Sequence, residues 1–284
     1  MGVVQVIVSG LIVGGLYAVV ATGLSLTWGV MNIVNVSHGA FYMIGSFITY
    51  SLYMKLGVNP FLSFLLTLLI IFAVGLVAEK TLIHPVRKSG ENVVLITFAL
   101  AIFLEEVARI TWGLIYRTTA PYFKGTIDVF GIILDWQRVG TFCIGILVLI
   151  IFNMFLKKTK IGKATRMVEQ DEEVAMLLGI NVDRIYLITF AIGACLAASA
   201  ASLLAPLYLI YPSMGWTPLL FSFSIVVLGG MGSMKGTIYA GFLFGVISLL
   251  TTYFISSGWV NVIPFTILVL VLLVKPSGLF GREA

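Results

Sequence analysis

The sequence predicts an all-α, polytopic membrane protein with about nine transmembrane or broken helices. Its 284 residues are 60% hydrophobic and only 10% charged, and the mean hydropathy is +1.10. Soluble domains carry about 25% charged residues, so this composition argues against one. The chain also contains nine apolar runs of roughly the 17 to 25 residues that a bilayer core requires. We therefore expect residues 1–284 to form a single transmembrane domain.

The nine expected spans follow one another with short polar turns, apart from two longer loops at 115–138 and 157–184. No basic segment precedes the first apolar run, which predicts a retained helix and not a cleaved signal peptide. The spans lie near residues 3–27, 39–55, 61–79, 93–114, 139–156, 185–208, 216–232, 237–255 and 259–274.

The distribution of positive charge predicts the orientation. If loop 157–184 is cytoplasmic and the spans alternate, the inner segments hold 12 Lys and Arg residues and the outer segments hold 4. Cytoplasmic loops are enriched in these residues, so we expect an external N-terminus and a cytoplasmic C-terminus. The net charge of +5 is then a topology signal and does not indicate a nucleic-acid partner.

Glycine pairs predict close helix packing. Gly10 and Gly14 in the first span, and Gly241 and Gly245 in the eighth, have the GxxxG spacing that lets membrane helices approach closely. Glycine is common in membrane helices, so the alternative is a chance spacing.

Residues 23–45 break the apolar pattern of the first two spans. Asn35, Ser37 and His38 stand there, followed by Gly39, where apolar residues are expected. Polar, irregular backbone at membrane depth is tolerated when it is buried in protein or faces a cavity, and broken helices often form transport sites. We therefore predict that these four residues line a transport path; the alternative is a plain turn between two spans.

The fourth span carries three charged residues. Glu105 and Glu106 stand four and three positions before Arg109, so either acid can reach the arginine. An intramembrane charge is a functional-site hypothesis by default. The two interpretations are a structural ion pair between helices, which we favour, and a proton relay.

The outer loop 115–138 contains a hairpin signal. The run TIDVFGIILDWQR alternates roughly in twos around Gly131, which is typical of two short strands. Such a lid would meet an external binding protein, or it would only cap the helices.

Loop 157–184 is the one long charged segment, and it predicts an amphipathic helix over 163–178. Gly162 and Gly179 mark its ends, and an apolar stripe faces a charged side. Such a helix lies flat on lipid or docks onto a soluble partner, and its acidic residues favour docking because the inner leaflet is anionic. The expected docking set is Gly162, Ala164, Arg166, Met167, Val168, Glu169, Asp171, Ala175, Leu178 and Gly179.

The glycine-rich run VVLGGMGSMKG, at the end of the seventh span, is not a phosphate loop. A Walker motif needs Lys and Ser or Thr directly after its second glycine. Gly229, Gly230 and Gly232 instead predict a tight hairpin between spans seven and eight.

Catalytic and metal chemistry have little support in the sequence. Cys143 and Cys195 lie inside apolar runs, and His38 and His84 are the only histidines, so we expect no metal site and no bound cofactor. An enzyme is the weakest class. Two classes remain: the passive membrane subunit of a partner-driven importer, and an ion-coupled secondary transporter.

Four stretches resemble the LivH-type permeases, the membrane subunits of branched-chain amino-acid ABC importers. They are GLSL…GVMNIVN…HG after the first span, GKATR…AMLLGIN in the charged loop, LGGMGS…G after the seventh span, and LVKPSGLFG near the end. The resemblance implies a coupling helix in loop 157–184 and ATPase partners that bind ATP and Mg. It also implies a second permease subunit, identical or paralogous, an external binding protein, and a prokaryotic plasma membrane. Leucine, isoleucine or valine is the implied substrate; urea, amides and other amino acids use similar permeases.

Overall fold

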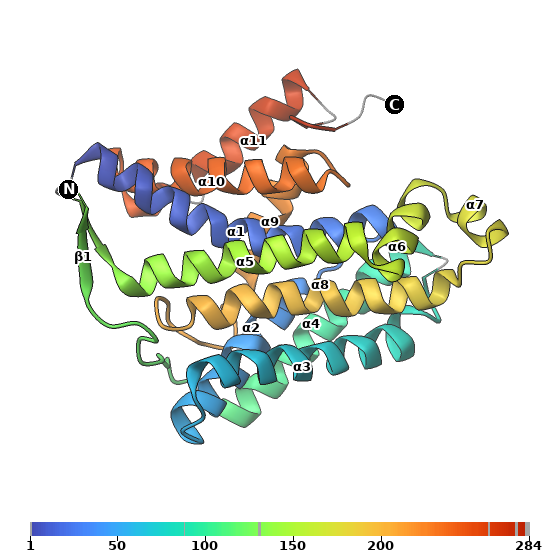
Figure 1. Ribbon diagram of the computed structural model, residues 1–284, viewed down its shortest axis with the longest axis horizontal. Helices are drawn as coiled ribbons and strands as arrows, with labels where there is room; N and C mark the ends of the chain where they lie inside the picture. Colours follow the sequence, from blue (N-terminus) through green and yellow to red (C-terminus); the bar gives the residue numbers. More distant parts are fainter. Residues whose placement is uncertain (1, 88, 130–131, 261, 276–277, 282–284) are drawn as a thin grey trace.

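The computed structural model describes residues 2–87, 89–129, 132–260, 262–275 and 278–281. Long helices run in roughly one direction through the molecule (Figure 1). The N-terminus and the strands lie at one end, which we call the hairpin end, and helices α6 and α7 lie at the other, which we call the loop end (Figure 1). The elements are α1 Val3–Met31, α2 His38–Tyr50, α3 Pro60–Ala78, α4 Gly90–Trp112, β1 Thr126–Val129, β2 Ile132–Asp135, α5 Trp136–Lys158, α6 Lys160–Gln170, α7 Glu172–Leu177, α8 Val182–Leu204, α9 Trp216–Gly229, α10 Met234–Phe254 and α11 Val262–Val274.

Every predicted span coincides with a helix. π-Helical turns continue α2 through Ser51–Lys55 and α3 through Glu79–Ile83, and a 3₁₀ turn at Ser257–Trp259 precedes α11. Among the described residues, five helices are long and apolar enough to cross a bilayer: α1, α3 with its continuation, α5, α8 and α10. The helix α9 is only 14 residues long, which is too short to cross alone.

Helices α1 and α8 form the centre of the bundle. The apolar stretch of α8 is 78% buried and that of α1 is 61% buried, against 28% for α3 and α5. A row of alanines along α8, including Ala191, Ala194 and Ala198, is fully buried and lets α2 and α3 pack closely.

The two glycine pairs meet between α1 and α10. A Cβ atom added at Gly245 would lie 2.3 Å from the Cα of Gly14, and one at Gly10 would lie 2.8 Å from the Cα of Val246. The helices therefore touch backbone to backbone, as the GxxxG spacing predicts.

Glycines also shape the turn between α9 and α10. Gly230 and Gly232 have φ angles of 96° and 79°, in the left-handed region that favours glycine. The C-terminal segment folds back here, where the N–H of Phe280 donates to the carbonyl of Gly229 at 3.2 Å. A Cβ at Gly229 would lie 2.5 Å from the carbonyl carbon of Gly236, so the hairpin is as tight as expected.

The predicted hairpin forms the two-stranded sheet of an otherwise mainly helical fold. Strands β1 and β2 pair antiparallel, with Thr126 opposite Asp135 and Val129 opposite Ile132. Gly131, at its predicted centre, lies outside the described residues. The preceding segment is anchored to α8, because the Tyr122 hydroxyl donates to the carbonyl of Ser202 at 2.8 Å. Burial raises the pKa of Tyr122.

Candidate functional site

The polar break between α1 and α2 lies inside the protein. Asn32 ends α1 in a left-handed conformation (φ 52°), and the chain then turns back so that α2 begins at His38. The Nε2 atom of His38 donates to the carbonyl of Val20 at 2.9 Å. This bond places the start of α2 beside Val20, which lies eleven residues before the end of α1. At the helical rise per residue, that is about 16 Å from the end of α1. The break is therefore at membrane depth.

The predicted path residues of this break are fully buried. Asn35, Ser37 and His38 each have 0% exposure. The Ser37 hydroxyl donates to the Asn35 Oδ1 atom at 2.6 Å, and the backbone N–H of Val36 donates to the Thr97 hydroxyl at 3.2 Å. These bonds hold the start of α2 in place, and a direct role of the three side chains in transport stays a prediction.

A second short helix begins at the same place. The backbones of Gly39, near the start of α2, and Gly215, just before α9, are in contact. A Cβ at either glycine would lie within 2.3 Å of the other's carbonyl oxygen. Helix α2 and the short helix α9 thus begin beside each other inside the bundle, and helices that begin at membrane depth are typical of transport sites.

A cavity of about 370 Å³ opens next to this junction. Tyr17 lies on its wall and is the middle residue of α1, fourteen positions from either end. Its ring packs edge-on against Phe221 of α9, with centroids 5.4 Å apart. The lining is aliphatic and aromatic with a few hydroxyl groups, and consists of Tyr17, Tyr42, Leu204, Leu207, Tyr208, Leu209, Tyr211, Met214, Thr217, Pro218 and Phe221.

This cavity was not predicted from the sequence. Its walls come from α1, α2, the end of α8, the segment after α8, and α9. Most of the residues are ordinary for a membrane helix, so no local pattern marks them. The clustering of Tyr208 and Tyr211 with Pro212 after α8 was the available signal for an irregular, lined segment.

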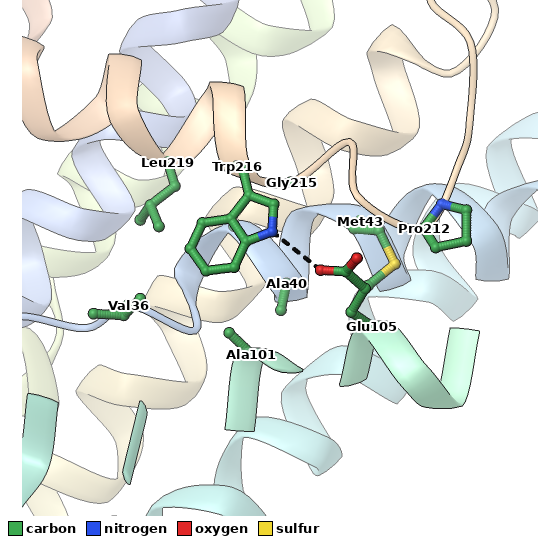
Figure 2. Close-up of a pocket in the computed structure, with 10 residues that line it drawn as sticks. Val36, Ala40, Met43, Ala101, Glu105, Pro212, Gly215, Trp216 and Leu219 are labelled. Carbon is green, nitrogen blue, oxygen red and sulfur yellow. Dashed lines mark hydrogen bonds between the residues drawn. The ribbon is translucent and has the colours of Figure 1, made fainter. Parts of the chain in front are cut away.

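A smaller pocket lies on the other side of the junction, between α2, α4 and α9. Figure 2 shows the indole of Trp216 pointing at the carboxylate of Glu105, with Gly215 beside it. The indole Nε1 donates to the Oε2 atom of Glu105 at 3.0 Å. Gly39 also lines this pocket. The other three predicted path residues, Asn35, Ser37 and His38, line neither this pocket nor the larger cavity.

The predicted charge cluster on α4 is present. Arg109 donates to the Oε1 atom of Glu105 at 3.1 Å and lies 3.3 Å from the Oε1 atom of Glu106. Glu105 is mostly buried at 15% side-chain exposure, whereas Glu106 and Arg109 are 49% and 43% exposed. Because Glu105 also holds Trp216, the cluster ties α4 to α9.

The charged loop differs from its predicted shape. It forms two helices, α6 and α7, and not one helix over 163–178. Asp171 ends the first and begins the second, because its carboxylate accepts the N–H of Val174 at 3.0 Å and caps α7. Gly162 lies inside α6, where a Cβ would meet the carbonyl oxygen of Phe155 at 2.2 Å. Gly179, with φ 80°, ends this part of the loop as predicted.

The predicted docking stripe is split between two faces. Val168 and Ala175 are buried at 4% and 0% exposure and belong to the core of the bundle. Val168 and Ala175 are therefore packing residues, and their placement in the docking set was wrong. Leu177 is 87% exposed and Leu178 is 63% exposed.

The remaining residues of the predicted set lie around α6. Ala164 is half-buried against the core, and Met167 is 37% exposed. Arg166 and Glu169 line a hollow of about 930 Å³ at the loop end, opposite the α9–α10 turn and the end of α1.

Comparison with known proteins decides the family. The family described as "Branched-chain amino acid transport system / permease component" matches residues 6–272. The chain belongs to this family. It is 31% identical, over 98% of its own length and 95% of the relative's, to the high-affinity branched-chain amino acid transport system permease protein LivH of Escherichia coli K12. It is 27% identical, over 100% of its length and 94% of the relative's, to a probable branched-chain amino acid transport permease protein LivH of Methanocaldococcus jannaschii.

A solved structure shares the fold. PsaBC from Streptococcus pneumoniae, solved in complex with a Fab, matches with a TM-score of 0.53 and 14% identity, over 95% of this chain and 91% of that one. Together with the five spanning helices, the family places this permease component in the inner membrane as a multi-pass protein. Its role is in transport and not in catalysis.

Proposed function

We propose that this permease is the membrane subunit of an ATP-driven importer for branched-chain amino acids. An external binding protein delivers the substrate, and separate ATPase subunits bind ATP and Mg and drive transport. The observation that carries this proposal is the exposed apolar cluster on α7, because it needs a protein partner at the loop end.

The cluster consists of Val174 and Leu177 on α7 and of Leu178, the residue that directly follows this helix; they are exposed by 48%, 87% and 63%. They stand at i, i+3 and i+4, the spacing by which an amphipathic helix lays its apolar side into a groove. Glu172 and Glu173 precede them, so the flank is acidic and unsuited to an anionic lipid surface. A groove in an ATPase subunit would fit both the apolar side and the acidic flank of this cluster.

The packing of α6 supports a route from the loop to the cavity. Helix α6 contacts α5, α8 and α1, and it approaches α5 closely at Gly162. The far end of α8, at Leu204, lines the cavity beside Tyr17. A push on the loop would therefore move helices that form the cavity wall.

The cavity supports a substrate with an apolar side chain. Its volume of about 370 Å³ is in the range of small-ligand sites, and its lining is mainly aliphatic and aromatic. Leucine, isoleucine and valine, which the relatives' names specify as a class, fit this chemistry better than urea or a short amide.

An ion-coupled secondary transporter is the second candidate. The observation in its favour is the Glu105–Glu106–Arg109 cluster on α4. Its carboxylates are already paired with Arg109, and Glu105 also accepts a bond from Trp216, which suits a structural link.

The orientation follows from the same proposal. The loop end, with Asp171, is cytoplasmic, and the hairpin end, with Lys124, is external. In intact cells a membrane-impermeant thiol reagent should label a cysteine at position 124 and not one at position 171. Labelling only at 171 would reverse the orientation and remove the ATPase from the loop end.

The test of the function is Leu177→Glu. This change places a charge at the centre of an apolar contact, where buried anchors dominate the binding energy. We expect the amount of ATPase subunit that co-purifies with the chain, and the uptake of substrate, each to fall by at least about tenfold. Leu56→Glu is the matched control, because Leu56 is 70% exposed near the hairpin end. Full uptake by the purified chain in vesicles without an ATPase would instead favour the ion-coupled transporter.

A further inference from the structure

A second cavity, of about 240 Å³, lies between the spanning helices α3 and α5. Both helices pack on α8, and Leu203, near the end of α8, forms the inner wall of the cavity. Among the described residues that line it, none is charged, and the hydroxyl of Tyr122 already donates to the carbonyl of Ser202. A buried water needs two to four polar partners, so this lining suits an apolar occupant.

An aromatic roof separates the cavity from the hairpin end. The ring of Phe123 meets the ring of Phe61 on α3, with centroids 6.4 Å apart, and a Cβ atom at Gly140 of α5 would lie 2.6 Å from it. The backbone N–H groups of Tyr122 and Phe123 donate to the Oε1 atom of Gln137 at 2.7 and 3.0 Å. The roof is therefore fixed to α5 and reaches across to α3.

The cavity opens sideways, between the faces that α3 and α5 turn away from the bundle. Leu65 of α3 lines it and is 55% exposed, and Leu147 and Ile151 of α5 line it and are 53% and 57% exposed. The apolar stretches of both helices are only 28% buried. In a multi-pass membrane protein the medium outside such faces is lipid, so the opening meets the acyl chains of the bilayer.

The geometry points to this cavity as a binding site for one acyl chain of a membrane phospholipid, which enters sideways between α3 and α5. Its volume is below the roughly 300–1,000 Å³ of sites that enclose a whole small ligand, which suits one segment of a longer chain. The lining residues Ile144 and Ile151 of α5 are seven positions apart, so the site extends about 10 Å along that helix. An acyl chain restores the dispersion contacts that the walls of a gap forgo.

The site shares a helix end with the larger cavity. The acyl chain packs against Leu203, and the next residue, Leu204, lines the cavity beside Tyr17. The bond from Tyr122 to Ser202 joins the roof to the same turn of α8. Lipid and candidate transport site therefore contact the same end of α8. The inference uses the membrane placement of the family and does not depend on the substrate or on the ATPase.

A photoactivatable phospholipid tests the site. The purified permease is reconstituted into vesicles of phosphatidylethanolamine and phosphatidylglycerol, with a trace of phosphatidylethanolamine that carries a diazirine in the middle of one acyl chain. After illumination, mass spectrometry maps the labelled residues. Leu203 is only 2% exposed, so lipid on the outer surface does not reach it, whereas Leu69 on α3 is 66% exposed and reports that surface lipid.

We expect the label at both Leu203 and Leu69 in the parent protein. Label at Leu69 with none at Leu203 would overturn the inference, because it would show lipid on the outer surface only. A protein segment seated in the cavity would give the same negative result at Leu203.

Val148→Trp tests whether the acyl chain reaches Leu203 through this cavity. Val148 lines the cavity and is half-buried, so a larger ring at this position fills part of the space. We expect labelling of Leu203 to fall at least about tenfold while labelling of Leu69 is unchanged. Ile150→Trp is the matched control, because Ile150 is 50% exposed on the same helix and does not line the cavity.

Equal labelling of Leu203 in the parent and in Val148→Trp would overturn the route through the cavity. An equal loss in Val148→Trp and Ile150→Trp would overturn it as well, since the loss would then not depend on filling the space. If Val148→Trp does not assemble in the membrane, the labelling of Leu203 in the parent still decides whether an acyl chain is bound.

Discussion

Two of the polar segments that interrupt the apolar pattern, residues 32–37 and 157–184, are used in opposite ways. The first is turned inward: Asn35 and Ser37 are fully buried and bonded to each other. The second is turned outward, and its apolar Leu177 is 87% exposed. A break in hydropathy thus locates an irregular segment, but the direction of its side chains decides what that segment does.

The difference has a physical origin in the neighbours of each segment. Residues 32–37 lie beside α1 and α4 at membrane depth, where unbonded polar groups are costly. The protein supplies partners there for the N–H of Val36 and for the Ser37 hydroxyl, which bonds to the Asn35 Oδ1 atom. Helix α7 lies beyond the spanning part of α8 and packs through one small residue, Ala175. Its other apolar side chains are left for a partner.

The largest expected effect is that of Ala175→Glu. An unpaired buried charge destabilises by about 3–5 kcal/mol, so α7 should detach from the bundle. Limited proteolysis of the loop in inside-out vesicles should accelerate, together with loss of the ATPase. Leu177→Glu should lose the ATPase with an unchanged cleavage pattern. An unchanged pattern for Ala175→Glu would return this residue to the docking surface.

Gly39→Ala should have the next largest effect. The new methyl group would lie 2.3 Å from the carbonyl oxygen of Gly215, so α2 and α9 must separate. Forcing an extra methyl group into a packed contact lowers stability by about 1–3 kcal/mol. Because this contact is between two backbones, which cannot move aside easily, we expect a loss near the upper end of that range. A thermal-unfolding assay on the purified protein should show a lower unfolding temperature for Gly39→Ala than for the parent. Gly258→Ala is the control, because the nearest atom to its new methyl group is 3.7 Å away and it should unfold like the parent.

Asn35→Leu should have an intermediate effect on the buried interruption. It leaves the hydroxyl of Ser37 without its acceptor, which costs about 1–3 kcal/mol at a buried site. The start of α2 should loosen, so we expect reduced uptake with full recovery of the ATPase, whereas Leu177→Glu should reduce both. Unchanged uptake by a stable protein would mean that residues 32–37 form only a turn.

Much of the fold was predictable because hydropathy and glycine spacing are local signals. Each expected span holds a helix, and Gly14 and Gly245 meet as their spacing indicates. The cavity was not predictable, since Tyr17 and Phe221 are 204 positions apart and meet only through the packing of α1 and α9. The face of α7 was missed because Asp171 acts as a cap, and a cap within a helical pattern shifts every residue after it to a new face.

The smallest expected effect lies in a hydroxyl contact away from both interruptions. The Thr49 hydroxyl lies 2.9 Å from that of Thr67 and 2.7 Å from that of Ser202, so it links α2 to α3 and α8. Hydrogen bonds between membrane helices are worth about 0.6 kcal/mol on average, so Thr49→Val should lower stability by about that amount per lost bond. A double-mutant cycle with Thr67→Val in thermal unfolding measures the coupling. Thr81→Val, at an exposed hydroxyl that bonds only within its own helix among the described contacts, is the control. A coupling above about 2 kcal/mol would mean that this contact and not the buried break at residues 32–37 holds α2 in place.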